Sequence, residues 1–166
     1  MSGAQTLRGP TRRAKDRGRP LAAFAGEALV VCPRCQGPAF SKPRDAAGDI
    51  FAPRRLVCRR CGHVQEWNGR TVALGAPAGR DPHFGLPLWL ATPCCGDVLW
   101  AYNARHLEAL ADFVHARLRE RARDPDNGWS NAATTSRLPR WIKAAKHRAE
   151  VEKGIARLRA RLEKAS

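Results

Sequence analysis

The second half of the chain carries apolar residues at helical spacing. Asn103, a residue type that often caps helices, stands just before a run whose apolar members recur three or four positions apart. An Asp-Pro pair at positions 124 and 125 then interrupts the pattern. The spacing predicts a helix that begins after Asn103 and ends before this pair, with one apolar face made of Leu107, Leu110, Ala111, Val114 and Leu118.

Two further helical stretches follow this first one. Pro139 suits the first turn of a helix that opens near Ser136, and the face expected to be apolar holds Leu138, Trp141, Ile142 and Ala145. The last stretch has a narrow apolar seam at spacings of four, three and four, formed by Val151, Ile155, Leu158 and Leu162. Gly154 lies beside this seam and is expected to weaken the helix by about 1 kcal/mol relative to Ala.

The first half of the chain shows short β-like runs instead. Residues 28–31, 55–57 and 63–67 are predicted strands, and residues 41–53, with Pro43, Gly48 and Pro53, are a predicted loop. Residues 80–102 are rich in Pro, Gly and large apolar side chains without a sustained period, which indicates irregular, packed connecting structure. Their aromatic residues could stack on unpaired bases, although packing in the core is the commoner use of such side chains.

These patterns predict an α+β protein in which a small β module precedes a helical region. The division along the chain is a disordered basic tail (1–26), a β zinc ribbon (27–79), an aromatic-rich connecting segment (80–102) and a helical region (103–166). The tail has little apolar surface to bury, since Arg and Lys dominate its first twenty residues together with Pro and Gly.

The charge of the chain narrows the choice of partners. It has 30 Lys and Arg against 15 Asp and Glu, a net charge of +15 over 166 residues. Such an excess favours polyanions, so DNA or RNA is the expected partner, contacted through the basic tail and the C-terminal helices from Arg137 to Lys164. The alternative is that these charged side chains only form a solvated surface and contact no nucleic acid.

The cysteines supply the strongest chemical signal. Two C-x-x-C pairs, Cys32 with Cys35 and Cys58 with Cys61, are separated by a length of chain suited to a β hairpin. Four thiolates at this spacing match the tetrahedral preference of zinc and leave no open position for catalysis. The expected cofactor is therefore one structural Zn²⁺. The alternatives are ordinary buried cysteines, disulfides, or replacement of one ligand by His63.

Cys94 and Cys95 are not expected to be ligands of this zinc. Neighbouring residues project in different directions, so one ion rarely takes both, and a buried position in a tight Cys-Cys-Gly turn is the favoured interpretation. A second metal site with His83 or His106, or a thiol nucleophile activated by a histidine, remains open. The signatures of phosphate-binding loops, dinucleotide-binding turns, zinc proteases and serine hydrolases are missing, so we expect no enzyme.

The quoted motifs, taken together, resemble a known group. CPRC and CRRCG, followed by DPHFGLPLWL, TPCCGDVLWAYN and SRLPRWIKAAKHR, are similar to the blocks of small bacterial proteins described as TFIIB-type zinc-ribbon-containing. The resemblance runs from about residue 29 to the C-terminus and implies that Cys32, Cys35, Cys58 and Cys61 hold zinc. It implies no particular activity.

Three functions are consistent with these features of the sequence. The first is a zinc-binding protein associated with nucleic acid or transcription. The second is a protein–protein adapter whose last helix offers its apolar seam to a partner, and the third is a thiol-dependent enzyme using Cys94 or Cys95. Paired cysteines of this kind favour a reducing, cytoplasmic setting, and no apolar run is long enough for a membrane span, so no membrane partner is expected.

Overall fold

The computed structural model describes residues 13–16, 20–45, 50–69, 71–74, 77–115, 118–121 and 138–165, of which 13–16 and 118–121 are described as backbone only. Its strands are β1 (Arg13–Asp16), β2 (Ala28–Val31), β3 (Pro38–Pro43), β4 (Arg54–Val57), β5 (Val64–Trp67), β6 (Ala91–Cys94), β7 (Asp97–Trp100) and β8 (Leu118–Arg121). Its helices are α1 (Ala104–His115), α3 (Arg140–Lys143) and α4 (Arg148–Glu163), with 3-10 turns η1 (Leu21–Phe24) and η2 (Ala145–His147). The predicted α+β class is confirmed.

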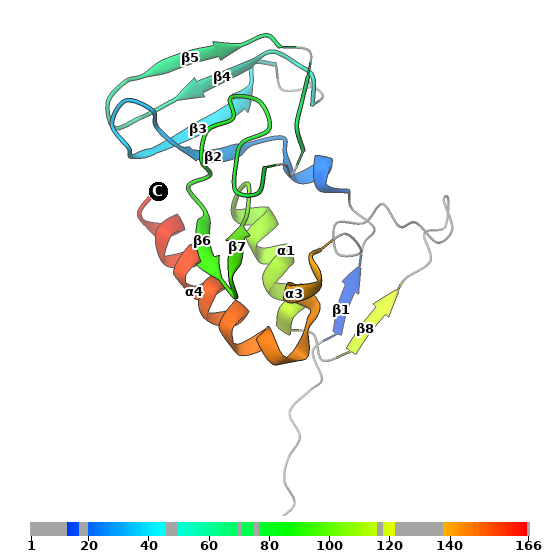
Figure 1. Ribbon diagram of the computed structural model, residues 1–166. Coiled ribbons are helices and arrows are strands. Elements are labelled where there is room, and N and C mark those ends of the chain that lie inside the picture. The colour runs from blue at the N-terminus through cyan, green and yellow to red at the C-terminus, as the bar shows by residue number, and fades with distance from the viewer. Residues whose placement is uncertain are drawn as a thin grey trace, which may run out of the picture.

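The strands form three separate groups. An antiparallel sheet has the order β2-β3-β4-β5, β6 pairs with β7 as a hairpin, and β1 pairs with β8 in parallel. Figure 1 shows the four-stranded sheet at one end of the molecule and the helices at the other, with the hairpin beside α4. No helix in the described part of the chain is long and apolar enough to cross a membrane.

The sequence analysis did not predict β3. Its predicted loop started at Ser41, whereas the strand runs to Pro43 and pairs with β2 through residues 38–41 and with β4 through residues 40–43. Both prolines of β3 are at its ends, where a missing backbone donor disturbs the ladder least. Ala39 and Ser41 are buried on one face, while Lys42 is exposed on the other.

Residues 91–100 form a hairpin, so the expectation of irregular structure over 80–102 was wrong there. Cys94 pairs with Asp97, and the two residues between them, Cys95 and Gly96, have φ values of 55° and 79°. Two successive positive φ values are typical of the tight turns whose twist suits a hairpin. The predicted Cys-Cys-Gly turn is thus confirmed. The hairpin that this turn closes was not predicted.

Two hydrophobic cores meet at β2. The sheet core lies on the face that carries Val30 and includes Phe24, Leu56, Leu88 and Tyr102. The helix core lies on the opposite side of β2, where Leu29 packs with residues of β6, β7, α1, α3 and α4. Adjacent residues of one strand therefore belong to different cores, as the alternation of side chains along a strand requires.

The outer edge of β2 is hydrogen-bonded as well. The Leu29 amide donates to the Tyr102 carbonyl at 2.7 Å, and the Leu29 carbonyl accepts from the Trp89 amide at 2.8 Å. One residue pair further on, the Val31 amide donates to Pro87 at 2.8 Å. These bonds tie the sheet to the segments directly before and after the β6–β7 hairpin. β2 is therefore paired along both edges.

Asn103 begins α1 as predicted. Its Oδ1 accepts a hydrogen bond from the His106 amide at 3.0 Å, the usual capping bond to the third helical residue. Its Nδ2 also donates to the carbonyls of Phe24 and Glu27, each at 2.7 Å. The helix ends at His115, earlier than expected, and Leu118 belongs to β8, whose backbone pairs with β1.

Residues 20–26 are part of the fold, which corrects the predicted boundary of the tail. Phe24 and Ala25 are buried, and the Phe24 ring stacks on His106 with centroids 4.9 Å apart. The residues before Pro20 lie outside the described part of the chain, except for β1. Phe24 and Ala25 thus join this segment to the sheet core.

The last two helices follow their patterns with one exception. In α3 the N-cap is Pro139, and Leu138, Trp141 and Ile142 pack on the helix core, but Ala145 is exposed because the chain changes to η2. In α4 the seam residues Val151, Ile155 and Leu158 are buried against the hairpin and α1. The seam is therefore internal to the protein.

Gly154 has a different role from the weakening predicted. It is buried in α4, and a Cβ built there would lie 2.8 Å from Leu99 Cδ2 and 3.6 Å from Cys94 Sγ. The missing side chain lets the hairpin approach the helix closely. The propensity cost of glycine is thus offset by packing between α4 and the hairpin.

We expect Gly154→Val to lower the free energy of unfolding by about 2 kcal/mol, because extra atoms would be forced into a filled core. Ala156→Val is the matched control, since it puts the same side chain at an exposed position of the same helix. Urea unfolding of the zinc-loaded proteins measures both. Equal stability of the two variants would contradict the close contact.

His106 is a titratable group whose pKa is shifted by burial alone. Burial lowers its pKa to about 4, because the charged imidazolium loses its hydration. Its Nδ1 accepts a hydrogen bond from the Tyr102 amide at 3.2 Å, and its ring lies among those of Phe24, Trp100 and Tyr102. The folded state thus requires the neutral form.

A pH dependence of stability follows from His106. Between about pH 6.5 and 4 the unfolded chain binds a proton here that the folded chain does not, so stability falls as pH falls, by up to about 1.4 kcal/mol per unit. His106→Asn keeps an acceptor for the Tyr102 amide but does not titrate. The difference in unfolding free energy between the two proteins should change with pH over this window, and a constant difference would contradict it.

Candidate metal centre

The two C-x-x-C segments form turns with the same hydrogen bonds. In the first, the Gln36 amide donates to the Cys32 carbonyl at 3.0 Å and the Cys32 amide donates to Gly37 at 2.8 Å. In the second, Gly62 and His63 take the places of Gln36 and Gly37, with both distances 2.9 Å. The turns close the β2–β3 and β4–β5 connections, so both lie at the same end of the sheet.

Each turn needs one residue with positive φ. That residue is Gly62 in the second turn, at 70°, but in the first it is Gln36, at 59°. Gly37 follows it for a different reason, since a Cβ there would lie 2.9 Å from Arg60 Cδ. The first turn therefore holds a non-glycine residue in a left-handed conformation, which costs about 1–2 kcal/mol and is sustained by its surroundings.

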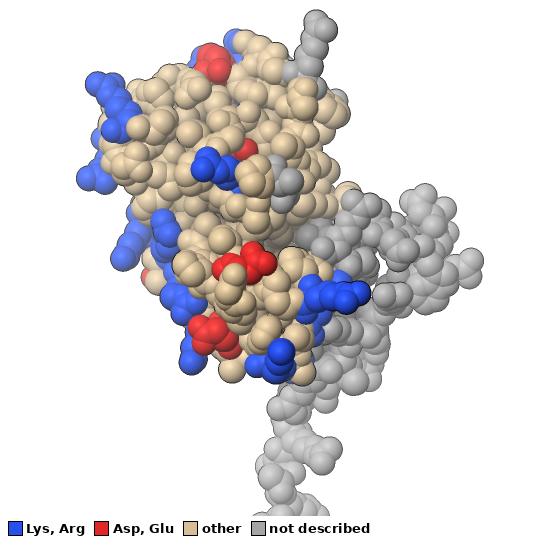
Figure 2. Space-filling view, in the orientation of Figure 1, with Lys and Arg blue, Asp and Glu red and all other residues tan. Residues whose placement is uncertain are grey.

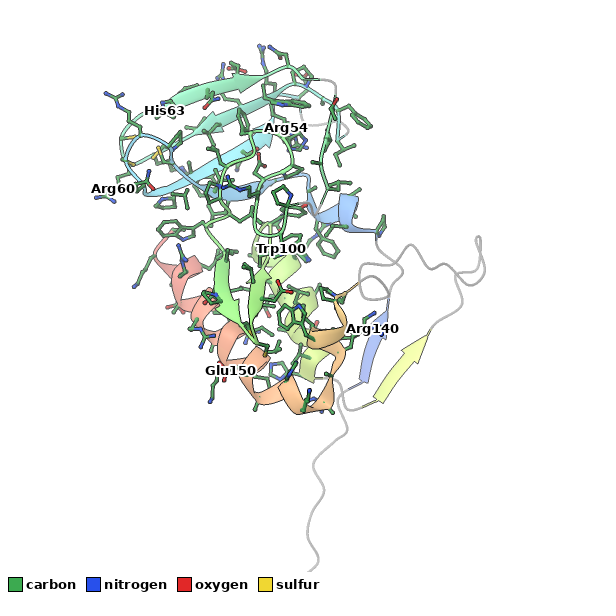
Figure 3. All side chains as sticks on the ribbon, in the orientation of Figure 1. Arg54, Arg60, His63, Trp100, Arg140 and Glu150 are labelled. Carbon is green, nitrogen blue, oxygen red and sulfur yellow. The ribbon has the colours of Figure 1, made fainter. Side chains whose placement is uncertain are left out.

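The four thiols of these turns meet at one point. Sγ of Cys32 and Cys61 are 3.7 Å apart, Sγ of Cys35 and Cys58 are 3.5 Å apart, and all four lie within 4.8 Å of one another. A tetrahedral zinc with bonds of about 2.3 Å has sulfurs about 3.8 Å apart. The cluster is thus compatible with one zinc ion, and Figure 3 shows the sulfurs at the end of the sheet near Arg60 and His63.

The donor set itself indicates a metal. Cys32 and Cys58 are buried and Cys35 and Cys61 are half-buried, and no disulfide joins them. The His63 backbone lowers the pKa of Cys61, but desolvation and its three neighbouring thiols outweigh this effect and raise the pKa to about 12. A zinc dication would reverse the preference, because it binds thiolates and releases their protons. Four thiolates would fill its shell and give it a structural role.

His63 contributes its backbone and not its ring. Its carbonyl accepts from the Cys58 amide, whereas the ring is outside the group of side chains close enough to share a metal. Within the described residues, the four cysteines are the one such group of three or more. The alternative in which His63 replaces a cysteine therefore has no support in the geometry.

Cys94 and Cys95 lie elsewhere. Cys94 is in the helix core, with its Sγ 3.7 Å from Cys95 Sγ and 3.7 Å from the Glu150 carbonyl. Burial, together with the Cys95 thiol, raises the pKa of Cys94 to about 11, which favours a protonated thiol, a poor nucleophile. His83 and His106 belong to the surroundings of the sheet core, so neither the second metal site nor the activated thiol gains support.

The aromatic residues of the middle segment are packed. Tyr102 is fully buried in the sheet core, and Phe84 and Trp100 pack against that core. Trp89 packs on the helix core, where its Nε1 donates to the Arg161 carbonyl at 2.9 Å. Packing, rather than stacking on bases, accounts for all four of them.

A buried polar group was missed by the sequence analysis. Arg54 is 1% exposed and donates from Nη1 to the Gly26 carbonyl at 2.9 Å, and burial lowers its pKa although Asp81 opposes the shift. Asp81 Oδ2 accepts from the amides of His83 and Phe84, at 3.1 and 2.6 Å. Arg54 thus links β4 to Gly26, while the Asp81 bonds hold the DPHFG loop in its turn. A charged residue beside a loop motif gives no sign of burial in the sequence alone.

Several C-terminal arginines are engaged within the fold. Arg159 makes two hydrogen bonds to Glu108 on α1, at 3.0 and 2.7 Å. Arg157 donates to the Pro93 carbonyl, and Arg161 donates to Ala91 and stacks on Trp89, 4.8 Å from the ring centroid. These bonds between α4 and its neighbours occupy arginines that were predicted to contact phosphates.

Comparison with known proteins adds no family. No family model, curated protein or solved structure matches the chain. The resemblance to TFIIB-type zinc-ribbon-containing proteins therefore stays a prediction, and the metal centre has to be judged on its own geometry.

We expect Cys35→Ser to lose zinc and to lose the order of the sheet, because binding and folding are coupled in small metal modules. Cys95→Ser is the matched control, a half-buried cysteine outside the cluster, and it should retain one zinc per chain. Metal analysis together with circular dichroism checks both. A metal-free wild-type protein with an intact sheet would contradict the assignment.

Proposed function

We propose that this protein binds one structural zinc ion in a ribbon-like sheet and associates with nucleic acid through the surface that the metal centre organises. Its basic character supports the proposal in general terms, but the arrangement of charges around the cysteine turns carries it. The zinc has no open position in this proposal, so its part is to fix the turns and not to react.

The observation behind the proposal is an electropositive edge. Arg34, Arg59 and Arg60 are exposed on the two cysteine turns, and among the described residues no carboxylate pairs with any of them. A zinc ion with four thiolates would carry a local charge of minus two, which three arginines outweigh. Figure 2 shows Lys and Arg side chains continuing along the same edge, beside α4.

Phosphates are the natural counter-charge for such an edge. Exposed Arg side chains present planar donors that match phosphate oxygens, and contacts of this kind bring affinity without base specificity. The basic residues before Pro20 would add to the attraction. Transcription is one setting in which a protein of this kind acts, consistent with the resemblance of its motifs.

The adapter hypothesis has less to support it. It relied on an exposed seam in the last helix, and Val151, Ile155 and Leu158 are 0–1% exposed because the hairpin and α1 cover them. A protein partner would have to use another surface. None of the described cysteines is an activated thiol, so we propose a binding role and not a catalytic one.

The test is fluorescence anisotropy of zinc-loaded protein with a labelled duplex and a labelled single strand over a salt series. Affinity should fall by about 0.9 log unit per decade of salt for each phosphate contacted on the duplex, and by about 0.7 on the single strand. Arg34→Gln with Arg60→Gln should flatten the slope. Arg140→Gln with Lys153→Gln removes the same charge from the helical end and serves as the control. Absence of binding at low salt would reject the proposal.

A further inference from the structure

A groove lies on the four-stranded sheet, and one of its lining residues, Phe40, also packs against the helix core. Its volume is about 510 Å³, in the range of sites that enclose a small organic molecule. Two cross-strand pairs form its floor, Phe40 opposite Val57 and Lys42 opposite Arg55. The remaining lining residues come from the end of β3 and from the second cysteine turn: Pro43, Arg44, Asp45 and Arg59.

The charge of this groove is unusual for a sheet. Lys42 and Arg55 lie directly opposite each other on β3 and β4, an arrangement of like charges that destabilises a strand pair. Arg44 and Arg59 add two more cations, against the single carboxylate of Asp45 in the lining. An anion bound in the groove would relieve the repulsion, so the arrangement favours an anionic ligand.

The existing partners of these cations are weak. Lys42 is 3.2 Å from Glu27, Arg55 is 2.7 Å from Glu66, and Arg44 is 4.0 Å from the same carboxylate. All are on the surface, with side chains of the cations about half exposed, and exposed pairs of this kind contribute about 0–1 kcal/mol. A phosphate can therefore exchange with these carboxylates at little cost.

An aromatic ring distinguishes the groove from a plain anion site. Phe40 lines it, with Lys42 Nζ 5.3 Å and Arg59 Cζ 5.1 Å from the ring centroid. Unpaired bases stack on aromatic faces and on guanidinium planes, and such stacking contributes about 1–3 kcal/mol per base. Cations that flank a ring can then bind the phosphates on either side of the stacked base.

We infer that the groove binds single-stranded nucleic acid, with one unpaired base against Phe40 and Val57 and the adjoining phosphates on Lys42, Arg44, Arg55 and Arg59. The inference rests on the proposed function and names its ligand. A concave site of this volume accepts an extruded base, whereas a duplex keeps its bases stacked inside and presents only phosphates.

The metal centre and this groove share a wall. Arg59 lies between the ligands Cys58 and Cys61, so the turn that holds the metal also positions this guanidinium over the Phe40 ring. The zinc would therefore affect binding without touching the nucleic acid. Its removal should weaken the single-strand complex together with the order of the second turn.

The experiment compares a labelled single-stranded DNA, an RNA of the same sequence and a duplex, all with zinc-loaded protein at low salt. Phe40→Leu keeps an apolar side chain for the helix core but removes the ring, and it should weaken single-strand binding about tenfold while leaving the duplex unchanged. Arg44→Gln with Arg59→Gln should weaken both single strands several-fold. Arg140→Gln with Lys153→Gln removes the same charge from the helical end. This control should weaken binding of the single strands less.

A second measurement avoids any effect of Phe40→Leu on folding. Oligonucleotides carrying one photoreactive base are cross-linked to the wild-type protein, and the attached peptide is identified by mass spectrometry. Attachment within residues 38–45 or 54–59 supports the groove, and attachment confined to α4 overturns it. The DNA and RNA arms show whether the 2′-hydroxyl contributes.

The outcomes separate the two proposals. Unchanged single-strand affinity in the groove variants, or an equal loss on the duplex, would overturn the groove as a single-strand site while leaving electrostatic association intact. No binding to any of the three nucleic acids at low salt would overturn both.

Discussion

The double pairing of β2 is the constraint on which the arrangement of the molecule depends. One edge of this strand completes the sheet, and the other is bonded to Trp89, Tyr102 and Pro87, which flank the β6–β7 hairpin in the chain. Leu29 and Val30 then point into different cores. A four-residue strand thus fixes the sheet with its cysteine turns relative to the helices, and Asn103 reinforces the junction through the carbonyls of Phe24 and Glu27.

The thiol cluster lies at the end of the sheet where the two cysteine turns meet, with Cys32 and Cys58 in the sheet core and Cys35 and Cys61 packed against it. β5 has exposed Val64, Gln65 and Glu66, so packing holds the last strand only weakly. Bringing the two cysteine turns together links the β4–β5 connection to the β2–β3 connection, across the sheet. The proposed metal and groove would then act together. The metal would make the turns rigid, and the neighbouring arginines would supply the positive charge.

The sequence predicted features that depend on short spacings. The cysteine pairs, the cap at Asn103, the apolar seam of α4 and the strand at Ala28 all follow from neighbours within a few positions, and the structure agrees with each. It could not predict features that depend on pairing between distant segments. The β6–β7 hairpin has Pro93 in one strand and no clear alternation, and Gly154 acquires its role only when Leu99 lies against it.

The groove shows the same limit more sharply. Phe40 with Lys42, and Arg55 with Val57, are unremarkable alternations in their own strands, and only the register that sets Lys42 opposite Arg55 brings four cations and a ring together. Arg54 was hidden for a related reason, since nothing near it in the sequence indicates its burial or the charge of Asp81 that acts on it. Local patterns determine which elements form, whereas surfaces made from several strands require the register.

The place of α4 in the chain has a consequence for synthesis. The sheet with its four cysteines, residues 28–67, leaves the ribosome before the hairpin, and α4 follows more than forty residues after the hairpin is complete. During that interval the face of the hairpin that receives Gly154, with Leu99 and Cys94, has no cover from α4. Domains generally fold in the order of translation. A nascent chain can thus bring its four thiols together early, while the apolar face of the hairpin waits for the last helix.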